Sequence, residues 1–278
     1  MSGTRSDVRS DVRADARADE GVGGIDSDAA AYLSLLSAQG VAVTGAQSSA
    51  IDAFYVTGKD EGWYSDLKRM FLPIWAAAGP NAIDMIGGTS GTYSGTVTHA
   101  AGYVQGNGST GYFDTGTALD TLGLTTSSAS LFYGVQVAHT SDSKSYAGAL
   151  DASPDGYVIA IRKNSAGGMR YIGFSPIAES NQSSSAGALG VNVITRTATD
   201  EFGVYKNGDV TIGTVSATGA IPAHKIYFMA RSNEDTADLH GNAKMYCFGV
   251  GLGLSATEAK SLANATQTLW ETTTGLSL

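Results

Sequence analysis

The sequence predicts a mainly β protein, an antiparallel β-sandwich with short helices before it and one helix after it. Strand-like segments follow one another about every ten to fifteen residues from residue 95 onward, with Gly, Asn, Ser and Asp between them, which is typical of a sandwich. Asn207 and Gly208 separate two β-rich runs, and this dipeptide favours a hairpin because a type I′ turn needs positive φ at both central residues. One helical pattern, residues 256–270, follows the last strand.

Composition agrees with this class and excludes others. The chain has 278 residues, 36 of them Gly, and only 15% are charged, which indicates one turn-dense domain with a large core. The net charge of −9 argues against a nucleic-acid partner, because such a surface would not neutralise phosphates. Cys247 is the single cysteine, so no internal disulfide forms. Its place within a predicted strand indicates a buried, inert thiol rather than a nucleophile.

The first 24 residues are predicted to be an extended arm that ends in a glycine-rich hinge. As a strand, residues 5–19 place alternating charges on one face and small or apolar residues on the other. Such a strand can pair with a copy of itself, since a shift of two residues sets each Arg opposite an Asp. A disordered, solvated arm is the alternative. The charged positions of this predicted assembly arm are Arg5, Asp7, Arg9, Asp11, Arg13, Asp15, Arg17 and Asp19.

Residues 25–80 are predicted to be a helical entry segment. Asp26 or Ser27 caps a helix over residues 28–39, Gly40 ends it, and a second helix begins after Ser48 or Ser49. A third piece, residues 64–69, leads into an apolar run over residues 70–78. That run is about half a membrane span, so no membrane insertion is expected. No charged-then-apolar signal opens the chain, so classical secretion is not expected either.

Residues 81–278 are predicted to form the sandwich and its closing helix. The predicted strands cover residues 95–104, 111–115, 130–138, 146–150, 157–162, 169–174, 189–195, 202–206, 210–215, 225–231 and 243–251. Residues 180–187 are a polar stretch that predicts a loop. Ser255 and Glu258 form an S-x-x-E capping box at the start of the closing helix. Its buried stripe is predicted to be Ala259, Leu262, Ala263, Thr266, Leu269 and Trp270.

Residues 238–259 resemble the closing segment of laminin-G-like, concanavalin-A-like jelly rolls. The shared features are a turn glycine, a long core strand and a Leu-Ser-x-x-Glu helix start, with the hairpin at residues 205–209 in the matching place before them. In the first half, residues 49–54, 62–63, 67, 72–73 and 108–116 resemble the entry segment of jelly-roll proteins of tailed phages. The resemblance covers roughly residues 28–272 and is specific for the fold.

The resemblance implies a structural virion component, assembled in the host cytoplasm and attached by its arm to other virion proteins and to copies of itself. A head fibre, a head decoration protein and a tail fibre all fit, and the displayed domain would meet host surface polysaccharide. A stand-alone carbohydrate-binding module is the competing class, and a sandwich glycosidase is a weaker one. A virion component would be multi-copy, a lectin would bind sugar as a monomer, and a glycosidase would release reducing ends.

No pattern in the sequence predicts catalysis. Sandwich glucanases carry Glu-x-Asp-x-Glu on one strand, and neither this pattern nor G-x-S-x-G occurs. Residues 106–111 match G-x-G-x-x-G, yet a strand rather than a helix is predicted to follow, which favours a turn over a phosphate site. The four histidines are scattered and form no metal-ligand pair. The protein is therefore expected not to be an enzyme and to need no cofactor.

Two sets of residues are candidates for binding. Glu234, Asp235 and Asp238 cluster in a predicted rim loop, where carboxylate oxygens can hold Ca²⁺ or a glycan; a solvated turn is the alternative. Trp63 and Trp75 could stack on a sugar, but both match apolar positions of the entry segment and are predicted to be core residues.

Overall fold

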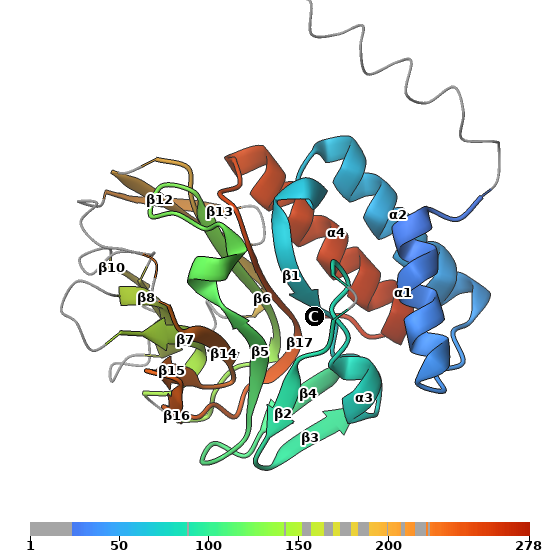
Figure 1. Cartoon of the computed structure of the whole chain (residues 1–278), viewed down its shortest axis with the longest axis horizontal. Coiled ribbons are helices and arrows are strands. Elements are labelled where there is room, and N and C mark those ends of the chain that lie inside the picture. Colours follow the sequence, from blue (N-terminus) through green and yellow to red (C-terminus); the bar gives the residue numbers. More distant parts are fainter. Residues whose placement is uncertain are drawn as a thin grey trace, which may run out of the picture.

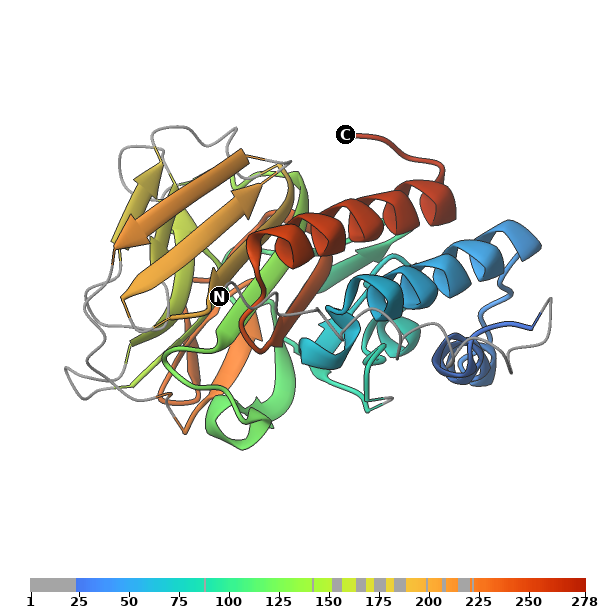
Figure 2. The same cartoon turned by 90° about the horizontal axis from the view of Figure 1, so that it is seen from above.

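The computed structural model describes residues 24–87, 89–141, 143–151, 157–163, 169–172, 179–182, 189–198, 200–206, 209–214, 221 and 223–278. The predicted assembly arm and the Asn207-Gly208 turn lie outside these residues. The described chain forms two sheets packed face to face, with helices on the far side of one sheet (Figures 1 and 2). The predicted β-sandwich with a closing helix is confirmed.

The first sheet carries the helices. Its order is β13 (Asp209–Thr214), β12 (Glu201–Lys206), β11 (Gly190–Arg196), β6 (Ala129–Val137), β17 (Lys244–Gly251), β4 (Tyr103–Gly106) and β3 (Val97–Ala100). All described pairs in it are antiparallel. A further strand, β1 (Leu67–Phe71), also pairs with β17. The predicted hairpin between β12 and β13 is confirmed, with Lys206 opposite Asp209.

The second sheet is the outer layer. Its order is β10 (Glu179–Gln182), β9 (Met169–Ile172), β8 (Tyr157–Lys163), β7 (Ser145–Leu150), β14 (Lys225–Phe228), β5 (Tyr112–Ala118) and β2 (Thr92–Ser94). A short hairpin of β15 (Arg231–Asn233) and β16 (Thr236–Asp238) joins it, because β15 pairs in parallel with β7. This is a parallel contact in an otherwise antiparallel sheet.

The helical layer packs on the first sheet. It contains α1 (Ser27–Ala38), α2 (Gly45–Glu61) and α4 (Ala256–Thr274), while the short α3 (Ala78–Asn81) and the 3-10 turns η2 (Tyr64–Asp66) and η3 (Leu119–Leu122) lie in connections. Asp26 caps α1, and the predicted Ser255–Glu258 capping box starts α4. Among the described helices, none is both long and apolar enough to cross a bilayer.

Several predicted boundaries were wrong. The second helix begins at Gly45, because Thr44 and Gln47 form a capping box upstream of the predicted Ser48 or Ser49. The predicted helical entry segment also contains a strand, β1, since Met70 and Phe71 extend the first sheet. The predicted strand at residues 95–104 is the β3–β4 hairpin, turning at Gly102 with φ 92°.

Three further elements differ from prediction. The strand expected at residues 225–231 breaks at Met229, where φ is 63°, into β14 and β15. The stretch at residues 180–187 is not all loop, because residues 180–182 belong to β10 and pair with β9. The closing helix runs on to Thr274, four residues beyond its predicted end, and Gly275 ends it in a left-handed conformation.

The core has two parts, one on each face of the first sheet. Between the sheets, Phe228 stacks on Phe248 with ring centroids 4.6 Å apart, and Phe113 packs beside them. Under the helices, Tyr246 and Cys247 meet the apolar side of α4. Tyr246 and Cys247 are consecutive, yet both lie on the helical side of the sheet, because the register of β17 against β6 shifts between Met245 and Cys247.

The aromatic anchors of the helical layer are buried, as predicted. The six stripe residues of α4 are all buried. Trp63 and Trp75 are 0% and 8% exposed, and their indole N–H groups donate to Ser261 and Tyr32, so both are core residues. Trp270 is fully buried, stacks on Tyr246 at 4.5 Å and donates to the carbonyl of Gly102 at 2.8 Å.

Trp270→Ala is expected to lower the free energy of unfolding by roughly 3–5 kcal/mol, the usual cost of truncating a core aromatic side chain. The loss would be measured by urea denaturation. A midpoint that stays within error of the parent would mean that α4 does not seal the sandwich.

Gly58→Ala in α2 should also destabilise the fold, although Gly→Ala within a helix usually stabilises it. A Cβ at this position would lie 2.6 Å from the ring of Trp63, which is fully buried and cannot move aside. We expect a loss of about 1–3 kcal/mol from overpacking. Gly45→Ala is the matched control, because its Cβ would meet nothing within 4 Å. Equal denaturation midpoints for the two variants would contradict this packing.

Candidate functional site

The outer face of the second sheet carries a cluster of aromatic and charged side chains, here called the rim site. It consists of Tyr112 and Asp114 from β5, Lys225 and Tyr227 from β14, and Arg231, Asp238 and His240 from the β15–β16 hairpin and the residues after it. Along β5, Tyr112 and Asp114 alternate with Phe113, which faces the core, because successive strand residues point to opposite faces. Tyr227 lies directly opposite Asp114 in the pairing of β14 with β5.

Three rings form the aromatic part of the rim site. The ring of Tyr112 lies 4.7 Å from that of Tyr227 and 5.9 Å from that of His240. Tyr227 is 3% exposed and donates its hydroxyl to the carbonyl of Asp235 at 2.9 Å. Burial and, after it, the charge of Asp114 raise the pKa of Tyr227 to about 12, so it remains a donor at neutral pH. Tyr112 is only half-buried and is the ring that a ligand can reach.

The rim site also contains two ion pairs. The guanidinium of Arg231 meets Asp238 through two parallel bonds, Nε to Oδ1 at 2.8 Å and Nη2 to Oδ2 at 2.5 Å. This bidentate geometry fixes both side chains. Lys225 Nζ lies 3.2 Å from Asp114 Oδ2, and Gly116 N–H donates to Asp114 Oδ1 at 2.7 Å. The polar groups of the rim site are therefore held in place before any ligand binds.

The backbone around the rim site is strained. Met229, Glu234, Asp235 and Leu239 have φ values of 63°, 49°, 60° and 48°. A left-handed conformation of this kind costs of order 1–2 kcal/mol of folding free energy for a residue with a side chain. Glu234 and Asp235 are the two central residues of the β15–β16 turn, a position that favours Asn-Gly. Besides the bond from the Tyr227 hydroxyl to Asp235 O, the turn is held by Glu234 N–H to Leu150 O at 3.0 Å and Lys225 N–H to Asp235 Oδ1 at 2.9 Å.

The predicted rim-loop residues lie in this hairpin but do not converge. Asp235 bonds to the Lys225 amide and lies 3.3 Å from His224 Nδ1, whereas Asp238 is paired with Arg231. Glu234 is exposed at the turn. Within the described ranges, no group of three or more His, Cys, Asp or Glu side chains is arranged to hold a metal. Binding of Ca²⁺ at these three residues stays a prediction.

Of the rim-site residues, only Asp238 was predicted from the sequence; those missed were Tyr112, Asp114, Lys225, Tyr227, Arg231 and His240. One signal was present in the sequence: Tyr112 and Asp114 alternate with the apolar Phe113, a pattern that predicts a strand with Tyr112 and Asp114 on its outward face. The sequence gives no sign that β14 pairs with β5, more than one hundred residues earlier in the chain, and this pairing assembles the site.

Two other motifs hold no site. In the G-x-G-x-x-G segment, Asn107 Oδ1 accepts the N–H groups of Ser109, Thr110 and Gly111 at 2.8–3.0 Å, so these donors are already used. The segment leads into β5 rather than a helix, which agrees with the predicted turn. Cys247 is fully buried, and burial raises the pKa of its thiol well above the usual range, so it is not a nucleophile at neutral pH.

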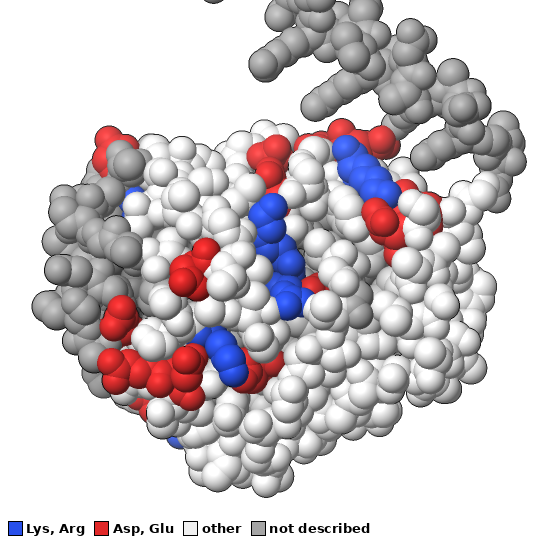
Figure 3. Space-filling view, viewed as in Figure 1, with Lys and Arg blue, Asp and Glu red and all other residues white. Residues whose placement is uncertain are grey.

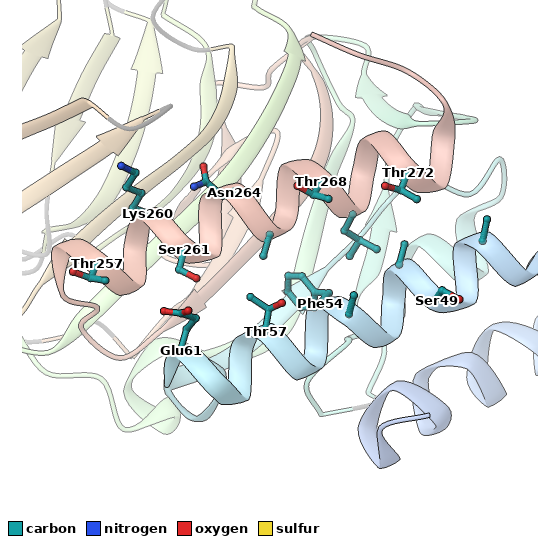
Figure 4. Close-up of a pocket in the computed structure, with 15 residues that line it drawn as sticks. Ser49, Phe54, Thr57, Glu61, Thr257, Lys260, Ser261, Asn264, Thr268 and Thr272 are labelled. Atoms are coloured by element: carbon teal, nitrogen blue, oxygen red, sulfur yellow. The ribbon is translucent and has the colours of Figure 1, made fainter. Parts of the chain in front are cut away.

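A groove of about 640 Å³ runs between α2 and α4 (Figure 4). Most of its walls are small side chains, and Phe54 and Leu269 are larger apolar ones. Among the described residues that line it, only Glu61 and Lys260 are charged. This groove lacks the combination of an accessible aromatic ring and fixed ion pairs, which is what orients a polar ligand. The rim site has that combination, so it is the stronger candidate for ligand binding.

Comparison with known proteins agrees on the fold. No family model matches the chain, and no curated protein matches it by sequence. The structure is similar to the receptor binding domain of botulinum neurotoxin mosaic serotype C/D, with TM-score 0.52 and 11% identity, covering 72% of this chain and 51% of that chain. It is also similar to the botulinum neurotoxin serotype D binding domain, with TM-score 0.50 and 9% identity, covering 72% of this chain and 52% of that chain.

A third similar structure is domain 4 of AbnA, a GH43 extracellular arabinanase from Geobacillus stearothermophilus, in complex with arabinotriose. The match has TM-score 0.44 and 15% identity and covers 71% of this chain and 98% of that chain. This chain spans about half the length of the toxin domains that it matches. At these identities the likeness defines the fold alone, an antiparallel β-sandwich of jelly-roll type.

Proposed function

We propose that this protein is a glycan-binding jelly-roll domain, and that the rim site binds the sugar. The observation that carries the proposal is the partly exposed ring of Tyr112, which packs on Tyr227 and His240, together with the fixed Arg231–Asp238 pair two residues before His240. The two matched toxin structures are a binding domain and a receptor binding domain, which supports a binding role for this fold.

The chemistry of the rim site suits a sugar. The apolar face of a pyranose can pack on an aromatic ring, and its hydroxyl groups both donate and accept hydrogen bonds. Each carboxylate oxygen has more than one lone pair, so Asp114 and Asp238 can accept a hydroxyl while they keep their cationic partners. Since these groups are already fixed, binding costs little side-chain ordering.

We propose no catalytic role for the rim site. A glycosidase places a carboxylic acid opposite a second carboxylate across the bond that breaks. In the rim site, Asp114 and Asp238 each accept a hydrogen bond from a cationic side chain, which suits binding rather than proton donation. A sandwich glycosidase, which would release reducing ends, is therefore the weaker alternative.

We further propose that the domain is displayed on a virus particle of the tailed-phage type. The support is the resemblance of the sequence to jelly-roll proteins of such phages, together with the self-complementary arm at residues 5–19. The arm would attach the domain to other virion proteins or to copies of itself, as a head fibre, head decoration or tail fibre. A stand-alone lectin-like module, monomeric in solution, is the competing proposal.

Tyr112→Ala should weaken sugar binding by up to about tenfold, because a ring contact contributes about 0.5–1.5 kcal/mol. The ligand would first be found on an array of immobilised oligosaccharides and then titrated by NMR. Tyr103→Ala is the matched control, a half-buried tyrosine on the first sheet, and should bind as the parent does. Equal loss in both variants, or none in either, would place the sugar elsewhere.

Deleting residues 1–20 should leave a folded sandwich that no longer joins its assembly, because both described core clusters lie beyond the arm. Attachment by the full chain should weaken as salt rises, since the arm's charges are screened. Particle occupancy would be measured for the two chains. If the shortened chain occupies the particle fully, the arm is not the anchor.

A further inference from the structure

The charges of the rim site restrict the class of sugar that it can take. This inference rests on the proposed function. In Figure 3, acidic side chains gather over the region of β15 and β16, with basic side chains beside them. Among the described side chains, the charged groups of the rim site and its turn are the carboxylates Asp114, Glu234, Asp235 and Asp238 and the cations Lys225 and Arg231. These four carboxylates and two cations give the group a net charge of −2 when His224 and His240 are neutral.

Both cations of the rim site already face a carboxylate. Arg231 is held by Asp238 through both Nε and Nη2, and Lys225 lies 3.2 Å from Asp114. Lys144, near the start of β7, donates to the carbonyl of Gly108 at 2.6 Å. A ligand carboxylate would have to compete at each cation with a carboxylate that is already in place, in bidentate geometry at Arg231, and would do so among an excess of carboxylates.

An uncharged sugar meets no such obstacle. Its hydroxyls can donate to the remaining lone pairs of Asp114 and Asp238 and accept the remaining N–H groups of Lys225 and Arg231. The ion pairs then serve as neutral hydrogen-bonding units, and the ring of Tyr112 supplies the stacking surface. We infer that the rim site binds uncharged saccharides and rejects acidic ones such as uronic acids and sialylated glycans.

A matched pair of ligands tests this directly. A hexose oligosaccharide and the corresponding hexuronic acid differ only in a hydroxymethyl group replaced by a carboxylate. Titrated by NMR against the full chain at low salt, the hexose form should bind at least about tenfold more tightly, because two net negative charges act on the added carboxylate at short range. The ratio should fall as salt is raised.

Variants at the edge of the site separate charge from shape. Thr236 is exposed on β16 beside the turn, and its side chain is not one of the rim-site groups. Thr236→Lys should improve binding of the hexuronic acid by about three- to tenfold, and Thr236→Glu should weaken it, while hexose binding stays unchanged. Thr257→Lys is the matched control, since Thr257 is exposed at the start of α4 in the helical layer.

The outcomes distinguish the two proposals. Equal or tighter binding of the hexuronic acid would overturn this inference and leave the glycan-binding function intact. If Thr236→Lys and Thr257→Lys improve the binding of the hexuronic acid equally, this inference is also overturned. The net charge of the whole molecule, rather than the charges of the rim site, would then determine the preference for uncharged sugars. If no oligosaccharide of either kind binds, the proposed function fails and this inference with it.

Discussion

The structure depends on the burial of both faces of one strand, β17. Phe248 packs against the opposite sheet, while Tyr246 and Cys247, displaced by a register shift against β6, meet the underside of α4. Because β17 pairs with β1, β4 and β6, it holds the entry segment, the first hairpin and the sheet centre together. The helical layer thus covers a face that would otherwise expose aromatic side chains to water.

The rim site lies on the second sheet, whereas the described helices α1, α2 and α4 pack on the first. The β15–β16 hairpin contacts the outward ring of Tyr227, whose hydroxyl donates to the carbonyl of Asp235. That hairpin keeps an unfavourable backbone at Met229, Glu234, Asp235 and Leu239, and its parallel contact with β7 and its side-chain bonds hold it there. Strain kept in this way is typical of sites where position matters more than stability.

Much of the fold could be predicted because its signals are local. The Ser255–Glu258 box and the stripe from Ala259 to Trp270 define α4 within twenty residues, and the Asn-Gly dipeptide defines one hairpin. The errors arose where the signal was weaker or came from elsewhere. Thr44 caps α2 ahead of two serines that could also cap, and Met229 breaks a β-rich run that continues without interruption in sequence.

The sequence by itself determined the class of fold and the closing helix, because periodicity and capping are properties of neighbouring residues. The burial of Trp63 and Trp75 was predicted from the resemblance of the entry segment, and both are buried. Only the tertiary structure decided the rim site. Glu234, Asp235 and Asp238 stand close in sequence, yet their side chains take different partners. Tyr112 and Tyr227 are far apart in sequence and come together because β5 pairs with β14. Strand pairing over such a separation depends on how two faces of a core fit, which no local pattern encodes.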